Sequence, residues 1–129
     1  MQESGENYLE TILILGERNG TVRSIDIANE LGYAKPSVSR AVRLLIERGL
    51  VIMEPSGELT LTADGFDMAS AIYERHKIIS RFFVELLHVD KDIADRDACR
   101  IEHVISEYSF ERIKDYVRKN FSDAQQHMA

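Results

Sequence analysis

The segment from Cys99 to His103 holds three side chains of the kinds that bind transition metals. A thiol (Cys99), a carboxylate (Glu102) and an imidazole (His103) stand at positions i, i+3 and i+4, a spacing that places all three on one face of a helix. Borderline cations such as Fe(II), Mn(II) and Zn(II) accept a mixed set of sulfur, oxygen and nitrogen ligands. The pattern predicts a metal site, although a buried cysteine beside a surface Glu–His pair would have the same spacing.

Two further groups could complete such a site. Asn7 and Glu10 lie three residues apart, on one face of an expected first helix, and His76 lies midway along a long expected helix between Ile72 and Ile79. Carboxylate, amide and imidazole groups all bind metals. A single histidine on an apolar face can equally be a core residue with a protein partner, and the sequence leaves both interpretations open.

Three helices are expected in the first fifty residues, because apolar residues recur there at helical spacing. The first helix contains residues 8–15 and ends near the turn pair Asn19-Gly20. Ser24 is expected to cap a short second helix, 25–31, which Gly32 stops. A third helix starts near Pro36, which suits a first helical turn, and ends at the next glycine. Its apolar stripe consists of Val38, Ala41, Val42, Leu45 and Ile46.

Two short strands are expected after the third helix. Residues 50–53 and 58–62 flank the turn at 54–57 and have the pattern of a hairpin. Helix, short helix, tight turn, helix and hairpin is the order of a winged helix-turn-helix. The prediction is a mainly α chain with a winged helix-turn-helix domain at 1–62 and an all-α domain at 63–129.

The second domain is expected to begin with a long helix. With Thr62 as its N-cap, the helical pattern continues to Leu86. Asp90 is expected to cap a further helix that extends to Ile105, and Ser109 or Phe110 opens the last one. The apolar residues of the last two helices exceed the needs of one internal face. They predict an exposed patch that pairs two copies of the chain, unless the long helix covers it. This set consists of Ile93, Ile101, Val104, Ile105, Ile113 and Val117.

The net charge of −6, from 16 Lys and Arg against 22 Asp and Glu, by itself opposes nucleic-acid binding. The third helix is the exception, because four basic residues and one acidic residue lie between Gly32 and Gly49. In a helix-turn-helix this helix enters the major groove. The hairpin tip, with Glu54 and Glu58, offers no basic side chain, and an ordinary solvated basic face is the alternative. The predicted DNA-binding residues are Lys35, Pro36, Ser37, Ser39, Arg40 and Arg43.

Several classes of protein are disfavoured. The single cysteine excludes an intrachain disulfide and favours a reducing, cytoplasmic compartment. Apolar runs fall far short of the roughly 20 residues of a membrane span, and the N-terminus lacks the layout of a signal peptide. An enzyme is not expected, because a Gly-rich phosphate loop and a nucleophile motif are missing. A winged-helix regulator that senses a small ligand or redox state through Cys99 is the alternative to a metal sensor.

Taken together, these motifs resemble the diphtheria-toxin-repressor and manganese-transport-regulator (DtxR/MntR) family. The resemblance covers nearly the whole chain, through segments 7–12, 22–28, 35–39, 59–65, 75–76 and 99–106. It implies a cytoplasmic, homodimeric repressor of metal-homeostasis genes that binds a palindromic operator in double-stranded DNA when loaded with Fe(II) or Mn(II). The helical domain would serve metal binding and dimerisation, in a two-domain form without the family's SH3-like domain.

The resemblance also implies a ligand set. The implied metal-binding residues are Asn7, Glu10, His76, Cys99, Glu102 and His103. Cys99 is similar to the iron-type branch, whereas Glu10 matches a ligand of the manganese-type branch. Asn7 stands where Asp or Met is usual. Because a thiolate is a poor match for Mn(II), Fe(II) is slightly favoured.

The family's iron branch has an ancillary metal site, and here the chain departs from that pattern. Ser80 stands in place of a carboxylate and Asp95 in place of a histidine. One strong site is therefore expected, with a second metal held by Glu10, His76 and the shared carboxylate of Glu102. Each subunit would bind one or two metal ions.

Overall fold

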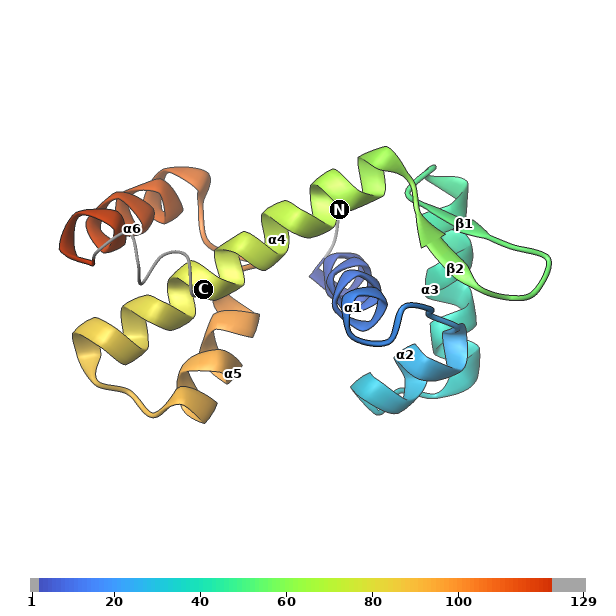
Figure 1. The fold of residues 1–129 in the computed structure, drawn as a ribbon, viewed down its shortest axis with the longest axis horizontal. Coiled ribbons are helices and arrows are strands. Elements are labelled where there is room, and N and C mark those ends of the chain that lie inside the picture. The colour runs from blue at the N-terminus through green and yellow to red at the C-terminus, as the bar shows by residue number, and fades with distance from the viewer. Residues whose placement is uncertain (1–2, 122–129) are drawn as a thin grey trace. The chain divides into compact units, whose positions relative to one another are not determined.

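The computed structural model describes residues 3–121, so residues 1–2 and 122–129 at the ends of the two predicted domains lie outside it. The chain divides into two compact units, Met1–Ala71 and Ile72–Ala129 (Figure 1). The first contains α1 (Glu3–Asn19), α2 (Ser24–Leu31), α3 (Lys35–Glu47), β1 (Val51–Met53) and β2 (Leu59–Leu61). α4 (Ala63–Arg81) begins in the first unit and ends in the second. There it is followed by η1 (Phe82–Leu86), α5 (Lys91–Ile101) and α6 (Glu107–Asn120). The predicted fold class, a winged helix-turn-helix followed by an all-α unit, is confirmed.

The first unit is a three-helix core with a hairpin. α1, α2 and α3 pack on one another, and β1 pairs antiparallel with β2, with Val51 opposite Leu61. Gly32 adopts φ +69° directly after α2, a left-handed conformation that glycine accepts at low cost, so α2 ends where predicted. The largest fully buried side chains of this unit are Leu9, Ile27, Val38, Val42 and Val51.

The start of α2 differs from the prediction by one residue. Arg23 rather than Ser24 is the N-cap, because the Asp26 carboxylate accepts a hydrogen bond from the Arg23 backbone N–H at 2.9 Å. The Arg23 guanidinium also donates to the Ser56 carbonyl in the hairpin turn at 2.5 Å. One residue therefore caps α2 and ties the tip of the hairpin to it.

The second unit has its own core between α4, α5 and α6. Thr62 caps α4 as predicted, since its Oγ1 accepts from the Gly65 N–H at 3.0 Å. The predicted long helix is α-helical only to Arg81, and its last part, η1, is a π-helical turn. The core consists of Ile79, Ala98 and Phe110, with Ile78, Phe83, Ile101 and Ile105 packed against them.

The boundaries of α5 and α6 differ from those predicted. α5 ends at Ile101, about one turn early, with Glu102 as its C-cap. α6 begins at Glu107, before the predicted start at 109 or 110, because the Ser106 Oγ accepts from the Ser109 N–H at 3.1 Å and so caps the helix. A tight turn separates the two helices.

The predicted pairing patch is largely wrong. Val117 is 1% exposed, and Ile101 and Ile105 pack on the unit's own core. Only Ile93, at 46%, and Val104, at 72%, are among the exposed large apolar residues. Ile101 and Ile105 pack on a core that includes Ile79 of α4, which agrees with the alternative that the long helix covers the apolar excess.

Candidate metal centre and nucleic-acid interface

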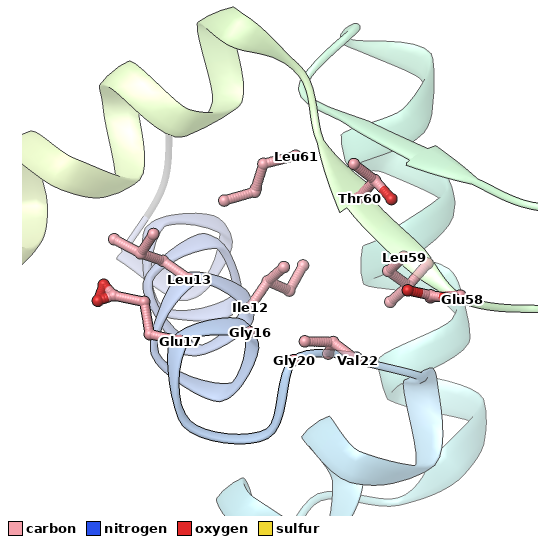
Figure 2. A pocket seen from close by; sticks show the side chains of 10 residues that line it. All are labelled: Ile12, Leu13, Gly16, Glu17, Gly20, Val22, Glu58, Leu59, Thr60 and Leu61. Atoms are coloured by element: carbon pink, nitrogen blue, oxygen red, sulfur yellow. The ribbon is translucent and has the colours of Figure 1, made fainter.

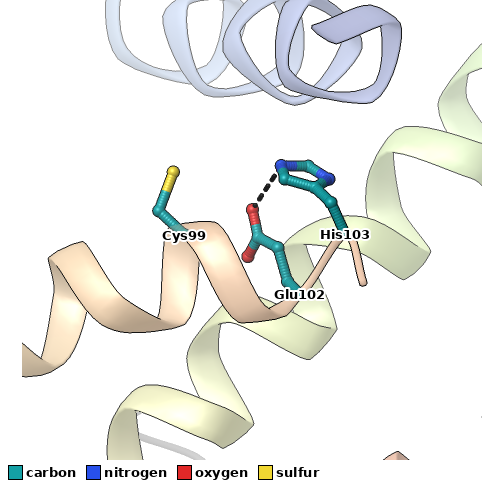
Figure 3. Close-up of side chains that lie close together, drawn as sticks. All are labelled: Cys99, Glu102 and His103. Carbon is teal, nitrogen blue, oxygen red and sulfur yellow. Dashed lines mark ion pairs between the residues drawn. The ribbon is translucent and has the colours of Figure 1, made fainter. Parts of the chain in front are cut away.

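Three of the four metal-ligand candidates of the second unit meet at the C-terminal end of α5. Cys99 lies in the last turn of that helix, and Glu102 and His103 follow its end. The thiol sulfur, a carboxylate oxygen and an imidazole nitrogen lie within 4.8 Å of one another, and Figure 3 shows the side chains projecting to the same side. The expectation that all three residues lie on one helix is wrong, because α5 ends at Ile101. Glu102 nevertheless keeps helical backbone angles (φ −57°, ψ −25°). The turn therefore preserves the spacing.

Glu102 is the centre of this cluster. Its side chain is fully buried, with Oε1 3.3 Å from Nε2 of His103 and Oε2 3.1 Å from Nδ1 of His76 on α4. Burying a carboxylate costs several kcal/mol unless positive charge and hydrogen bonds compensate. A divalent cation would supply that charge, and a sulfur, oxygen and nitrogen donor set fits a transition metal.

Arg75 holds the turn that carries these ligands. Its Nη1 donates to the backbone carbonyls of Glu102 at 3.1 Å and Ile105 at 3.2 Å, and its guanidinium lies 5.1 Å from the Phe110 ring centroid. Nη2 pairs with the Glu107 carboxylate, and this hydrogen bond lowers the pKa of Glu107. A cation on the last carbonyls of a helix is favourable. This role is not predicted from the sequence, where the only signal is a basic residue next to a predicted ligand.

Ser80 on α4 and Asp95 on α5 bind each other. The Ser80 hydroxyl donates to Asp95 Oδ1 at 2.5 Å, and Lys91 Nζ donates to Oδ2 at 3.1 Å. His76 Nε2 lies 3.8 Å from the same Oδ1. Burial raises the pKa of Asp95, but the hydrogen bonds from Ser80 and Lys91 and the charges of Lys91 and His76 outweigh burial, so the pKa is lowered.

Asn7 and Glu10 lie on α1 in the first unit. Their three-residue spacing places both on one face of the helix, and the Asn7 carbonyl accepts from the Thr11 hydroxyl at 2.8 Å. Their part in metal binding stays a prediction.

α3 presents the predicted DNA-binding residues on the side opposite its core contacts. The exposed ones are Lys35, Pro36, Ser39, Arg40 and Arg43. Ser37 is half-buried and accepts from Arg40 Nη2 at 3.4 Å. The buried face consists of Val38, Val42 and Leu45. Ile46, predicted for the apolar stripe, is 38% exposed because it lies beside that face rather than on it.

Tyr33, in the turn before α3, is an exposed aromatic residue that the sequence analysis did not single out. Its side chain is 46% exposed, and its ring packs edge-to-face on Tyr8 with centroids 5.9 Å apart. Burial, together with the neighbouring Tyr33, raises the pKa of Tyr8. The ring contact with Tyr8 supports the turn into α3.

A pocket of about 330 Å³ lies in the first unit between α1 and β2 (Figure 2). Its lining is mainly apolar and contains none of the predicted metal ligands or DNA-binding residues. The lining consists of Ile12, Leu13, Gly16, Glu17, Gly20, Val22 and residues 58–61.

A winged helix-turn-helix with a basic third helix, in one chain with a cluster of metal-ligand side chains around the buried Glu102, defines a DNA-binding regulator that responds to metal. Within residues 3–121, no helix is long and apolar enough to cross a membrane. Residues 1–59 match the family described as iron dependent repressor, N-terminal DNA binding domain. Residues 62–127 match iron dependent repressor, metal binding and dimerisation domain. The chain belongs to the DtxR/MntR family of metal-dependent transcriptional repressors.

Individual relatives agree with this assignment. The chain is 35% identical over 120 residues to an uncharacterized HTH-type transcriptional regulator of Methanocaldococcus jannaschii, covering 92% of this chain and 96% of that protein. It is 34% identical over 115 residues to the transcriptional regulator MntR of Escherichia coli O6:H1, covering 89% and 74%. A solved manganese-dependent transcriptional repressor in complex with manganese gives a TM-score of 0.81 at 29% identity, over 88% of this chain and 52% of that chain. This chain thus spans about half of that structure's length. The predicted family and the expectation of a regulator rather than an enzyme are confirmed.

Proposed function

We propose that this repressor is activated by Fe(II) or Mn(II), with Fe(II) slightly favoured, and then binds a palindromic operator as a homodimer. The observation that carries the proposal is the meeting of Cys99, Glu102 and His103 within 4.8 Å. A thiolate suits Fe(II) better than Mn(II), which prefers oxygen ligands. Because the thiol and the imidazole must lose protons to bind, metal affinity should fall at low pH.

Glu102 supports the proposal of a second metal position. Its two oxygens face two different imidazoles, those of His76 and His103, as expected of a carboxylate shared between two ions. Glu10 of α1 would complete the second position with His76 and Glu102, and Asn7 would offer an amide oxygen. Each subunit would then bind one strong and one further ion.

The proposed ligand set explains how metal would raise DNA affinity. Glu10 on α1 and the ligands of the second unit would hold one cation together, with the cation supplying the positive charge between their carboxylates. This link would restrict the first unit relative to the dimer and favour the arrangement in which both copies of α3 reach their half-sites. Metal and DNA would thereby stabilise the same state, which is positive coupling between two sites.

The proposed DNA contacts divide by chemistry. Side chains near the N-terminus of α3, Lys35, Ser37 and Ser39, would meet base edges and phosphates in the major groove, with Pro36 setting the first helical turn. Arg40 and Arg43, further along the exposed side, would bind phosphates. Two copies of α3 in a dimer would read half-sites about one helical turn, roughly 34 Å, apart.

The test is an anaerobic titration of Fe(II) and Mn(II) into protein mixed with labelled DNA selected from a random pool. We expect DNA affinity to rise with metal concentration, and the selected sites to be two-fold symmetric. Glu102→Gln should abolish the metal response, whereas Glu111→Gln, which changes an exposed carboxylate of α6, should keep it. Binding that ignores metal, or no binding at any metal level, would refute the proposal.

The oligomeric state needs its own measurement. Sedimentation of metal-free and metal-loaded protein should give the mass of a dimer. A monomer in both states would contradict the proposed reading of two half-sites.

A further inference from the structure

We propose that Asp95 is a positioning residue that orients the imidazole of His76, so that Nε2–H faces Asp95 and the Nδ1 lone pair is left for a metal ion. The inference rests on the proposed role of His76 as a metal ligand.

The His76 ring lies between two carboxylates. Nδ1 is 3.1 Å from Oε2 of Glu102, and Nε2 is 3.8 Å from Oδ1 of Asp95. A metal ion shared with Glu102 must bind on the Nδ1 side, so the ring proton must then reside on Nε2. At 3.8 Å the Asp95 interaction is electrostatic rather than a hydrogen bond. An N–H directed at a carboxylate is still attracted to it, whereas a lone pair directed there is repelled.

Asp95 is itself held in place from two elements. The Ser80 hydroxyl on α4 donates to Oδ1, and Lys91 at the start of α5 donates to Oδ2. Ser80 is 6% exposed and lies one turn after His76 on the same helix. Both carboxylate oxygens are therefore engaged, which suits a supporting group better than a metal ligand.

The other face of the site also limits rotation of the imidazole. The Tyr73 ring stacks on His76 at a centroid distance of 6.5 Å and an interplanar angle of 25°. Because Tyr73 restricts the plane of the imidazole, two orientations of the ring remain, with either Nδ1 or Nε2 facing Glu102. Asp95 favours the orientation in which Nδ1 faces Glu102. A carboxylate beside the second ring nitrogen of a metal-bound histidine is a common support of such ligands. Mutation of the supporting carboxylate typically lowers metal affinity about 10–100-fold.

The test compares Asp95→Ala with Asp97→Ala, which removes an exposed carboxylate from the same helix. Long-range ¹H–¹⁵N spectra of histidine-labelled protein saturated with diamagnetic Zn(II) report which nitrogen binds metal, and His76→Gln assigns the signals. We expect wild type and Asp97→Ala to show a metal-bound Nδ1 and a protonated Nε2 at His76. Asp95→Ala should show a mixture of both arrangements and should bind Mn(II) about 10–100-fold more weakly.

Ser80→Ala separates position from charge, because it leaves every charge in place. Like Asp95→Ala, it should give a mixture of Nδ1-bound and Nε2-bound His76, but it should lower Mn(II) affinity by less than Asp95→Ala does. An unchanged His76 spectrum in both Asp95→Ala and Ser80→Ala overturns the inference, even if affinity falls through lost charge. If Zn(II) leaves His76 of the wild type unperturbed, the proposed ligand role of His76 fails first, and the two failures are thereby distinguished.

Discussion

Replacing Arg75 by methionine should strongly destabilise the second unit, because the Arg75 guanidinium donates to two backbone carbonyls in the turn between α5 and α6. Its side chain is 20% exposed, so its two hydrogen bonds to the carbonyls of Glu102 and Ile105 are largely shielded from water. Hydrogen bonds from a charged group contribute about 1.5–3 kcal/mol each, and the contact with the Phe110 ring about 0.5–1 kcal/mol. With allowance for partial compensation by water, Arg75→Met should lower the free energy of unfolding by about 3–5 kcal/mol. The pair with Glu107 is left out of this sum, since that carboxylate is at the surface and solvent screens it.

The assay is urea unfolding of the metal-free protein followed by circular dichroism. Lys77→Met is the matched control, because it also removes a positive charge from α4. Within residues 3–121 the contact of the Lys77 ammonium is with the ring of Tyr73, whose centroid lies 4.6 Å away. This control should cost less than about 1 kcal/mol. Arg75→Lys should recover only part of the loss, since an ammonium lacks the planar fork that serves two acceptors. If Arg75→Met unfolds at the same urea concentration and with the same slope as Lys77→Met, the assigned role of Arg75 is wrong.

Three further predictions concern pH, packing and DNA. Because hydrogen bonding to Arg75 lowers the folded-state pKa of Glu107, that carboxylate stabilises the fold at neutral pH, and its contribution is lost as the pH falls below about 4.3 and through the lowered value. An NMR titration should show this pKa rising in Arg75→Met, and an unchanged value would contradict the pairing. Gly65→Ala should cost about 1–3 kcal/mol in urea unfolding, since a Cβ there would lie 2.0 Å from the Leu50 carbonyl oxygen; wild-type stability would show that the approach is not so close. Arg40→Gln should reduce the slope of log affinity against log salt by about 1–2 in a dimer, whereas an unchanged slope would remove Arg40 from the phosphate contacts.

Much of the first unit could be predicted because its signals are local. Gly32 ends α2 through its own backbone conformation, and Thr62 caps α4 through a residue three positions later. The segment from Cys99 to His103 likewise carries its chemistry within five residues, so these three candidate ligands can be predicted without any knowledge of packing. Such features depend on neighbours along the chain.

The details of the metal centre depend instead on neighbours in space. α5 ends at Ile101 rather than continuing, and the carbonyls at this end are held by Arg75, 27 residues away from Glu102 in sequence. Neither the spacing of apolar residues nor any capping motif indicates that partner. Likewise, Ile101 and Ile105 pack inward on a core that includes Ile79 of α4. The spacing of apolar residues in α4 does not show which residues of α5 and of the turn after it will cover that surface.

Residue types and spacing alone predict a metal-responsive regulator and the kinds of atoms available to a metal ion: sulfur from Cys99, oxygen from Glu102 and nitrogen from His103. How these atoms are supported, through Arg75 on the turn and Asp95 beside His76, emerges from the folded chain. Ligand identity is a property of residue type, whereas support requires a donor or acceptor at hydrogen-bonding or ion-pair distance. Such distances are set by the packing of α4 on α5 and not by separation along the chain.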